Sequence, residues 1–202
     1  DNKSEIKKLS SQFLNVTFLI SVPCCCGIIL VADQIVEVLF GVEFLPAIST
    51  IRILSILIVL MPLSGGVFCQ LLLTAGKEKS YLACVLIGTV VNAVLNYLLI
   101  PTFTQNGAAI ASVVAEFTVS ISMIVATRRT IKVNMCCRDV FSILTSAFVM
   151  SLTLVLCHKL FSGQAVWMRL LVEIVIAVLV YFLCVFMLKN SASSKIIRMI
   201  KK

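Results

Sequence analysis

Residues 81–100 read YLACVLIGTVVNAVLNYLLI, an apolar run without a charged side chain. At a rise of about 1.5 Å per residue, a helix of this length matches the hydrocarbon core of a bilayer, which is about 30 Å thick. Lipid offers the backbone no hydrogen-bond partners, so the N–H and C=O groups of such a run must satisfy one another, as they do in a helix. Residues 81–100 therefore predict a transmembrane helix.

Five further apolar runs of similar length lie on either side of this one, separated by short polar breaks. The six predicted spans are residues 13–32, 53–75, 81–100, 108–127, 140–157 and 170–188. The chain has 60% apolar residues and a mean hydropathy of +1.12, which excludes an ordinary soluble domain. The sequence predicts an all-α fold, a polytopic transmembrane helix bundle that forms a single membrane unit over residues 1–202.

The basic residues indicate how the chain is oriented in the membrane. All but three of the 17 Lys and Arg residues lie before the first span, after the sixth, or in the second and fourth breaks. This positive-inside pattern predicts a multi-pass protein of the cell (cytoplasmic) membrane with both termini cytoplasmic and residues 33–43, 102–106 and 159–166 outside. The net charge of +8 is thus a topology signal, and we expect no nucleic acid partner. Residues 189–202 predict a basic cytoplasmic tail that rests on membrane lipids.

Two local patterns interrupt the apolar runs. Pro62, followed by Gly65 and Gly66, predicts a bend in the second span, interpreted either as a site of close helix packing or as a hinge. Residues 33–43 alternate apolar and acidic side chains, which predicts a short helix at the membrane surface that ends at Gly41. Pro101 is expected to close the third span.

Ionisable and amide side chains within the spans are the candidate substrate or coupling groups, because such groups are costly in lipid. Glu116 lies two turns into the fourth span, where it either joins helices or serves as a coupling or cavity group. Asn92 and Asn96 are four residues apart and therefore face the same side of the third span. They either form hydrogen bonds between helices or belong to the site.

Charged residues and the histidine near the predicted outer ends of the spans are interpreted as follows. Arg52 precedes the second span, where it either extends to lipid headgroups or contacts an anionic headgroup or substrate. Arg169 and Glu173 are spaced as an i,i+4 ion pair beside Trp167, which we interpret as an interfacial anchor. His158, the only histidine, is interpreted as a lone residue at a helix end.

Sequence motifs for bond-making chemistry are missing from the chain. It contains no phosphate-binding loop, zinc-protease motif or nucleophile elbow, and its breaks are too short to hold an ATPase domain. The nine cysteines form no C-x-x-C pair with a nearby histidine. We therefore expect no catalytic residue, no cofactor and no metal site, and the protein is not expected to be an enzyme.

Several short motifs together resemble a known family. Phe40-Gly41, Ile51-Arg52-Ile53-Leu54-Ser55, Leu72-Leu73-Thr74-Ala75-Gly76-Lys77, Leu99-Ile100-Pro101 and Asn106-Gly107-Ala108-Ala109-Ile110-Ala111 occur in this order before Glu116. They are similar to the C-terminal half of the polysaccharide flippases of the O-antigen and teichoic-acid type. That group belongs to a superfamily with the MATE drug exporters and the lipid II flippases. A glycine that usually follows the Ile-Pro pair is missing here until Gly107.

The resemblance implies a transporter with two lobes, of which these spans would be the last six. The chain begins with Asp1 and not with Met, so we expect it to be a piece whose partner is the missing N-terminal lobe. The implied function is flipping of an undecaprenyl-diphosphate-linked oligosaccharide across the membrane by alternating access, for surface polysaccharide (O-antigen, lipopolysaccharide) biosynthesis. The alternatives are a cation-coupled multidrug antiporter, with Glu116 as the coupling acid, and a non-transporting membrane scaffold.

Overall fold

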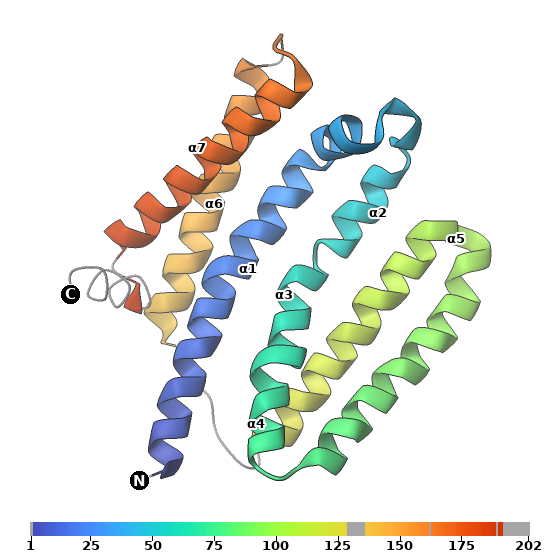
Figure 1. Cartoon of the computed structure of the whole chain (residues 1–202), viewed down its shortest axis with the longest axis vertical. Helices are drawn as coiled ribbons and strands as arrows, with labels where there is room; N and C mark the ends of the chain where they lie inside the picture. The colour runs from blue at the N-terminus through green and yellow to red at the C-terminus, as the bar shows by residue number, and fades with distance from the viewer. Residues whose placement is uncertain (1, 129–135, 162, 189, 192–202) are drawn as a thin grey trace. The chain divides into compact units, whose positions relative to one another are not determined.

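The structure is a computed structural model that describes residues 2–128, 136–161, 163–188 and 190–191. The described chain is almost entirely helical, and no strand occurs in it, which confirms the predicted all-α fold (Figure 1). The helices are α1 (Asn2–Phe40), α2 (Ala47–Leu54), α3 (Leu57–Met61), α4 (Cys69–Thr74), α5 (Glu78–Arg128), α6 (Cys137–Leu160) and α7 (Val166–Met187). A 3-10 turn, Val42–Phe44, precedes α2, and a π-helix, Pro62–Phe68, joins α3 to α4.

Five helical segments of the described chain are long and apolar enough to cross a membrane: Glu5–Phe40, Ala47–Thr74, Glu78–Arg128, Cys137–Leu160 and Val166–Met187. The third, α5, has 51 residues, and at about 1.5 Å per residue it is more than twice as long as the core of a bilayer is thick. It consists of two arms that meet at Thr104, whose φ of 49° and ψ of −125° are not helical. Figure 1 shows the arms running back alongside each other. The five segments therefore cover the six predicted spans except for Ala75 and Leu188.

Glycines allow the two arms of α5 to come together. A Cβ atom added at Gly107, just past the bend, would overlap the carbonyl oxygen of Leu99. Farther along the arms, a Cβ at Gly88 would overlap Cγ2 of Val119. Pro101 does not close the third span as expected, because the first arm continues through it to the bend at Thr104.

The Gly88 contact yields a test of the packing between the arms. Gly88→Ala should destabilise the protein by about 1–3 kcal/mol, because the new methyl group overfills a packed contact. Val119→Ala in the same chain removes the clashing methyl groups, so the double variant should recover most of the loss relative to Gly88→Ala. A double-mutant cycle on the apparent Tm measures this coupling. Additive effects of the two substitutions would contradict the contact.

The described helices divide between two compact units. Unit 1 comprises residues 1–17 and 53–134, and unit 2 comprises residues 18–52 and 135–202. In unit 1, α5 packs against α3, the π-helix and α4. In unit 2, α6 and α7 pack along each other, and the phenol of Tyr181 donates a hydrogen bond to the carbonyl oxygen of Leu19 at 2.8 Å inside the core. The single membrane unit and the cytoplasmic orientation of the termini stay predictions.

Both local patterns have a counterpart in the structure. The bend predicted at Pro62 coincides with the π-helix, in which the backbone departs from α-helical hydrogen bonding. The short helix predicted over residues 33–43 has a counterpart that ends where expected, and its place at the membrane surface stays a prediction. Residues 33–40 are helical and end before Gly41, whose φ is 88°, and a kink at Val31 separates them from the preceding part of α1.

Burial shows that one side of this part of α1 packs against the protein. Gln34 and Val36 are completely buried within unit 2, so the stretch is held by packing as well as by its amphipathic pattern. The predicted basic tail, residues 189–202, lies outside the described residues except for Asn190 and Ser191.

Candidate functional site

Unit 1 contains a cavity of about 560 Å³ between the two arms of α5 and the segment formed by α3 and the π-helix. Its polar lining includes Ser64 from the π-helix, Asn92 from the first arm of α5, and Ser112 and Glu116 from the second arm. Leu57, Met61, Val85, Val119 and Met123 are among its apolar lining residues. Hydroxyl, amide and carboxylate groups in an apolar wall are suited to binding a polar group inside a membrane.

Glu116 is hydrogen-bonded to Ser64, a residue of the π-helix at the bend of the second span. The hydroxyl of Ser64 donates a hydrogen bond to Oε1 of Glu116, and Ser64 itself is buried. Its Oγ also lies 3.2 Å from the carbonyl oxygen of Leu60, but a hydroxyl has one proton, and a carboxylate is the stronger acceptor. The structure thus places Glu116 against protein and cavity. Its role in coupling or substrate handling stays a prediction.

Asn92 and Asn96 do lie on one side of the first arm of α5. Nδ2 of Asn96 donates to Oδ1 of Asn92 at 2.7 Å, which is a bond along one helix and not the bond between helices that the sequence suggested. Oδ1 of Asn96 is buried without a hydrogen bond among the described residues. Asn92 lines the cavity with Glu116, so the structure brings these two candidates together.

Arg52, the fourth candidate, belongs to unit 2. Its Nε donates to the carbonyl oxygen of Ile29 at 3.1 Å, and its side chain lines a second cavity, of about 190 Å³. Asp33, His158, Lys159 and Glu173 line the same cavity. Arg52 is therefore tied to the backbone of α1 and faces both acidic and basic side chains. Its contact with headgroups or substrate stays a prediction.

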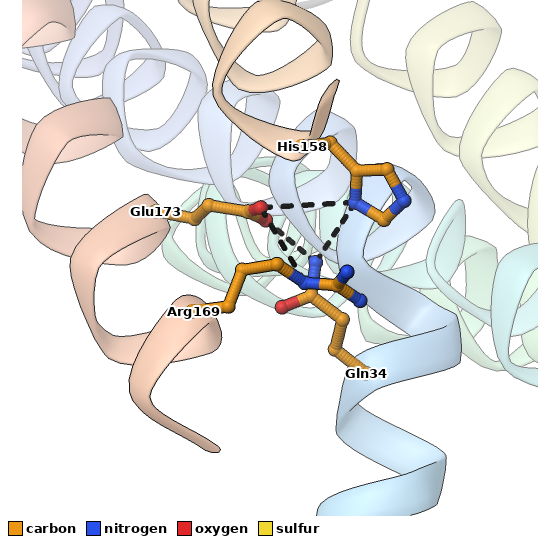
Figure 2. A network of polar contacts seen from close by, with 4 residues as sticks. All are labelled: Gln34, His158, Arg169 and Glu173. Atoms are coloured by element: carbon orange, nitrogen blue, oxygen red, sulfur yellow. Dashed lines mark hydrogen bonds and ion pairs between the residues drawn. The ribbon is translucent and has the colours of Figure 1, made fainter. Parts of the chain in front are cut away.

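A buried polar network beside this cavity connects α1, α6 and α7 (Figure 2). Glu173 and Gln34 are completely buried, and Nε2 of Gln34 donates to Oε2 of Glu173 at 2.6 Å. The same nitrogen lies 3.1 Å from Nδ1 of His158. Oε1 of Glu173 lies 3.7 Å from Nδ1 of His158 and 3.9 Å from Nε of Arg169.

Sequence reasoning missed this network. The interpretation of His158 as a lone residue is wrong. The predicted i,i+4 ion pair of Arg169 and Glu173 is present, but the carboxylate of Glu173 is also buried and bonded to Gln34; the interfacial role of the pair stays a prediction. One signal was available: Glu173 is an acid inside an apolar run, the same criterion that selected Glu116. Its partners lie 139 and 15 positions away along the chain, at Gln34 and His158, and the sequence does not show that pairing.

A family model and a solved structure that match the chain both belong to lipid II flippases. The family model of lipid II flippase MurJ matches residues 1–176. No curated protein matches the chain. Among solved structures, "Lipid II flippase MurJ, inward closed conformation" is similar with a TM-score of 0.73 and 14% sequence identity, and the match covers 98% of this chain and 41% of that one. The chain therefore spans about two fifths of the length of that protein.

The match extends from α1 into α7 and so includes Glu116, Asn92, Asn96 and Arg52. The sequence resemblance reached the correct superfamily, in which the lipid II flippases are one group. At 14% identity the structural similarity supports the fold, and the family model supplies the assignment. This multi-pass membrane chain belongs to the lipid II flippase MurJ family.

Proposed function

We propose that the chain is part of a flippase that moves a lipid-linked saccharide precursor across the membrane, with lipid II as its substrate. The observation that carries the proposal is the match of the lipid II flippase MurJ model to residues 1–176. A polar head cannot cross hydrocarbon unaided, because each unsatisfied polar group costs several kcal/mol there. Transporters with two lobes avoid this cost by enclosing the head in a cavity that opens to one side at a time.

The cavity in unit 1 supplies groups suited to this task. Hydroxyl and amide groups of a saccharide head can donate hydrogen bonds to Glu116. They can both donate to and accept from Asn92 and Ser112, which line the same cavity. A carboxylate repels a diphosphate, so we place the diphosphate away from Glu116. The polysaccharide lipids suggested by the sequence motifs are the second candidate substrate, since they share the polyprenyl-diphosphate carrier.

Reconstitution tests the substrate. The longer transporter that contains this chain is incorporated into proteoliposomes with labelled lipid II or with a labelled O-antigen-type lipid, and an impermeant reagent reports which leaflet holds the head. We expect lipid II to cross faster than the O-antigen-type lipid. Faster crossing of the latter would assign the chain to polysaccharide export, and crossing of neither would contradict a flippase.

The same assay tests Glu116. Glu116→Gln keeps the shape of the side chain and removes its charge, and we expect about tenfold slower flipping, the effect of losing about 1.4 kcal/mol of a hydrogen bond to a charged group. The matched control is Glu78→Gln, the same change at an exposed position at the start of α5. Normal flipping by Glu116→Gln at a normal protein level would leave Glu116 with a structural role alone.

A further inference from the structure

We propose that His158, Glu173 and Gln34 form a proton-binding site in unit 2. Uptake of one proton there replaces the hydrogen bond between α1 and α6 by one between α6 and α7. The site is separate from the Glu116 cavity, and the inference does not depend on which lipid is moved. The proton binds Nδ1 of His158, and the acceptor that this proton then requires is already in place on Glu173.

The observed contacts describe the form without the proton. The amide nitrogen of Gln34 can only donate, so its 3.1 Å contact with Nδ1 of His158 requires that Nδ1 accept. His158 is then neutral and carries its proton on Nε2. The two N–H groups of the Gln34 amide thus serve two acceptors, Nδ1 of His158 and Oε2 of Glu173.

The second form is indicated by an acceptor that this arrangement leaves without a hydrogen bond. Oε1 of Glu173 is buried and has no hydrogen bond among the described residues, although buried carboxylate oxygens are normally hydrogen-bonded. It lies 3.7 Å from Nδ1 of His158. When Nδ1 takes up a proton it becomes a donor, cannot remain paired with the Gln34 nitrogen, and can donate to Oε1 of Glu173 after a small rotation of the ring.

The exchange is balanced. One proton is taken from solvent, the bond from Gln34 to His158 breaks, and a charge-assisted bond from His158 to Glu173 forms. The bond from Gln34 to Oε2 of Glu173 remains in both forms. The side chain of His158 is 41% exposed while that of Glu173 is 1% exposed, so a proton reaches the imidazole through the open side of the network.

Charged groups from every neighbouring element face this site. The acids are Asp33 of α1 and Glu173 of α7, and the bases are Arg52 of α2, Lys159 of α6 and Arg169 of α7. Of these groups, Glu173 has the ion-pair contact with His158. Coulomb attraction falls with distance, and Glu173 is therefore the group that determines the exchange.

Nuclear magnetic resonance of the ¹⁵N-labelled chain in lipid nanodiscs tests the proposal. His158 is the only histidine of the chain, so its ring signals need no further assignment. At alkaline pH we expect the tautomer protonated on Nε2, with Nδ1 as acceptor. On acidification, the ring signals and the side-chain amide signals of Gln34 should change together, at one pH. A ring protonated on Nδ1 at alkaline pH, or Gln34 signals that do not follow the ring, would overturn the proposal.

Two matched variants identify the acceptor. Glu173→Gln and Asp33→Asn each remove one negative charge from the lining of the same cavity. We expect Glu173→Gln to abolish the joint change of the His158 and Gln34 signals and Asp33→Asn to preserve it. The opposite pattern, or equal behaviour of the two variants, would refute the role of Glu173. If Glu173→Gln does not fold, Gln34→Leu tests the proposal through the Gln34 contact. Without the Gln34 donor, His158 should populate both neutral tautomers. A single Nε2–H form would refute the Gln34 contact.

Discussion

Gly107→Ala is expected to remove most of the folded protein, because it blocks closure of the α5 hairpin. The added Cβ would overlap the carbonyl oxygen of Leu99 and lie 2.6 Å from its carbonyl carbon. Both are backbone atoms, which cannot move away as the end of a flexible side chain can. Overpacking costs about 1–3 kcal/mol where side chains can adjust, so we expect a loss at or above the upper end of that range. The measurement is the yield and apparent Tm of the purified chain.

Gly27→Ala is the matched control for this experiment. Gly27 lies inside α1, and an added Cβ there has no neighbour within 4 Å. Alanine is favoured over glycine in a helix by about 0.5–1 kcal/mol, so Gly27→Ala should keep or slightly raise the apparent Tm. If Gly107→Ala leaves the Tm equal to that of Gly27→Ala, the two arms of α5 do not meet as described.

The second large effect concerns the chain by itself. We expect the 202 residues alone to flip no lipid, because they correspond to about two fifths of the solved lipid II flippase chain that they match. A cavity between two lobes cannot form from part of one lobe, and the uncovered lobe surface should favour association. The measurement is flipping in proteoliposomes, with the longer transporter at equal protein level as the control. Flipping by the chain alone would contradict the two-lobe account.

The spans were predictable because lipid imposes a simple rule on the sequence. A run such as residues 81–100 has to form a helix whatever surrounds it, and a proline followed by two glycines, as at Pro62, marks a departure from regular α-helix. Pro101 was misjudged because a proline can remain inside a helix in a membrane when neighbouring groups replace the lost bond. The bend at Thr104 depends on the close approach of Gly107 to Leu99, which no local pattern reveals.

The candidate site was partly predictable for the same reason. An acid within an apolar run is costly, and this criterion found Glu116 directly. It also applied to Glu173, but the neighbouring Arg169 suggested a pair at the membrane surface. The complete burial of Glu173 follows from contacts with α1 and α6. The kink at Val31, which precedes the buried Gln34, has no evident sequence signal.

The central claim is that this chain is part of a lipid II flippase, and a measurement in cells tests it most directly. Cells are depleted of their own lipid II flippase and supplied with the longer transporter that contains this chain. The amount of lipid II at the outer leaflet is then measured with an impermeant reagent. We predict that the transporter restores outer-leaflet lipid II to the level before depletion. No increase over depleted cells, with the transporter present in the membrane at a normal level, would contradict the claim.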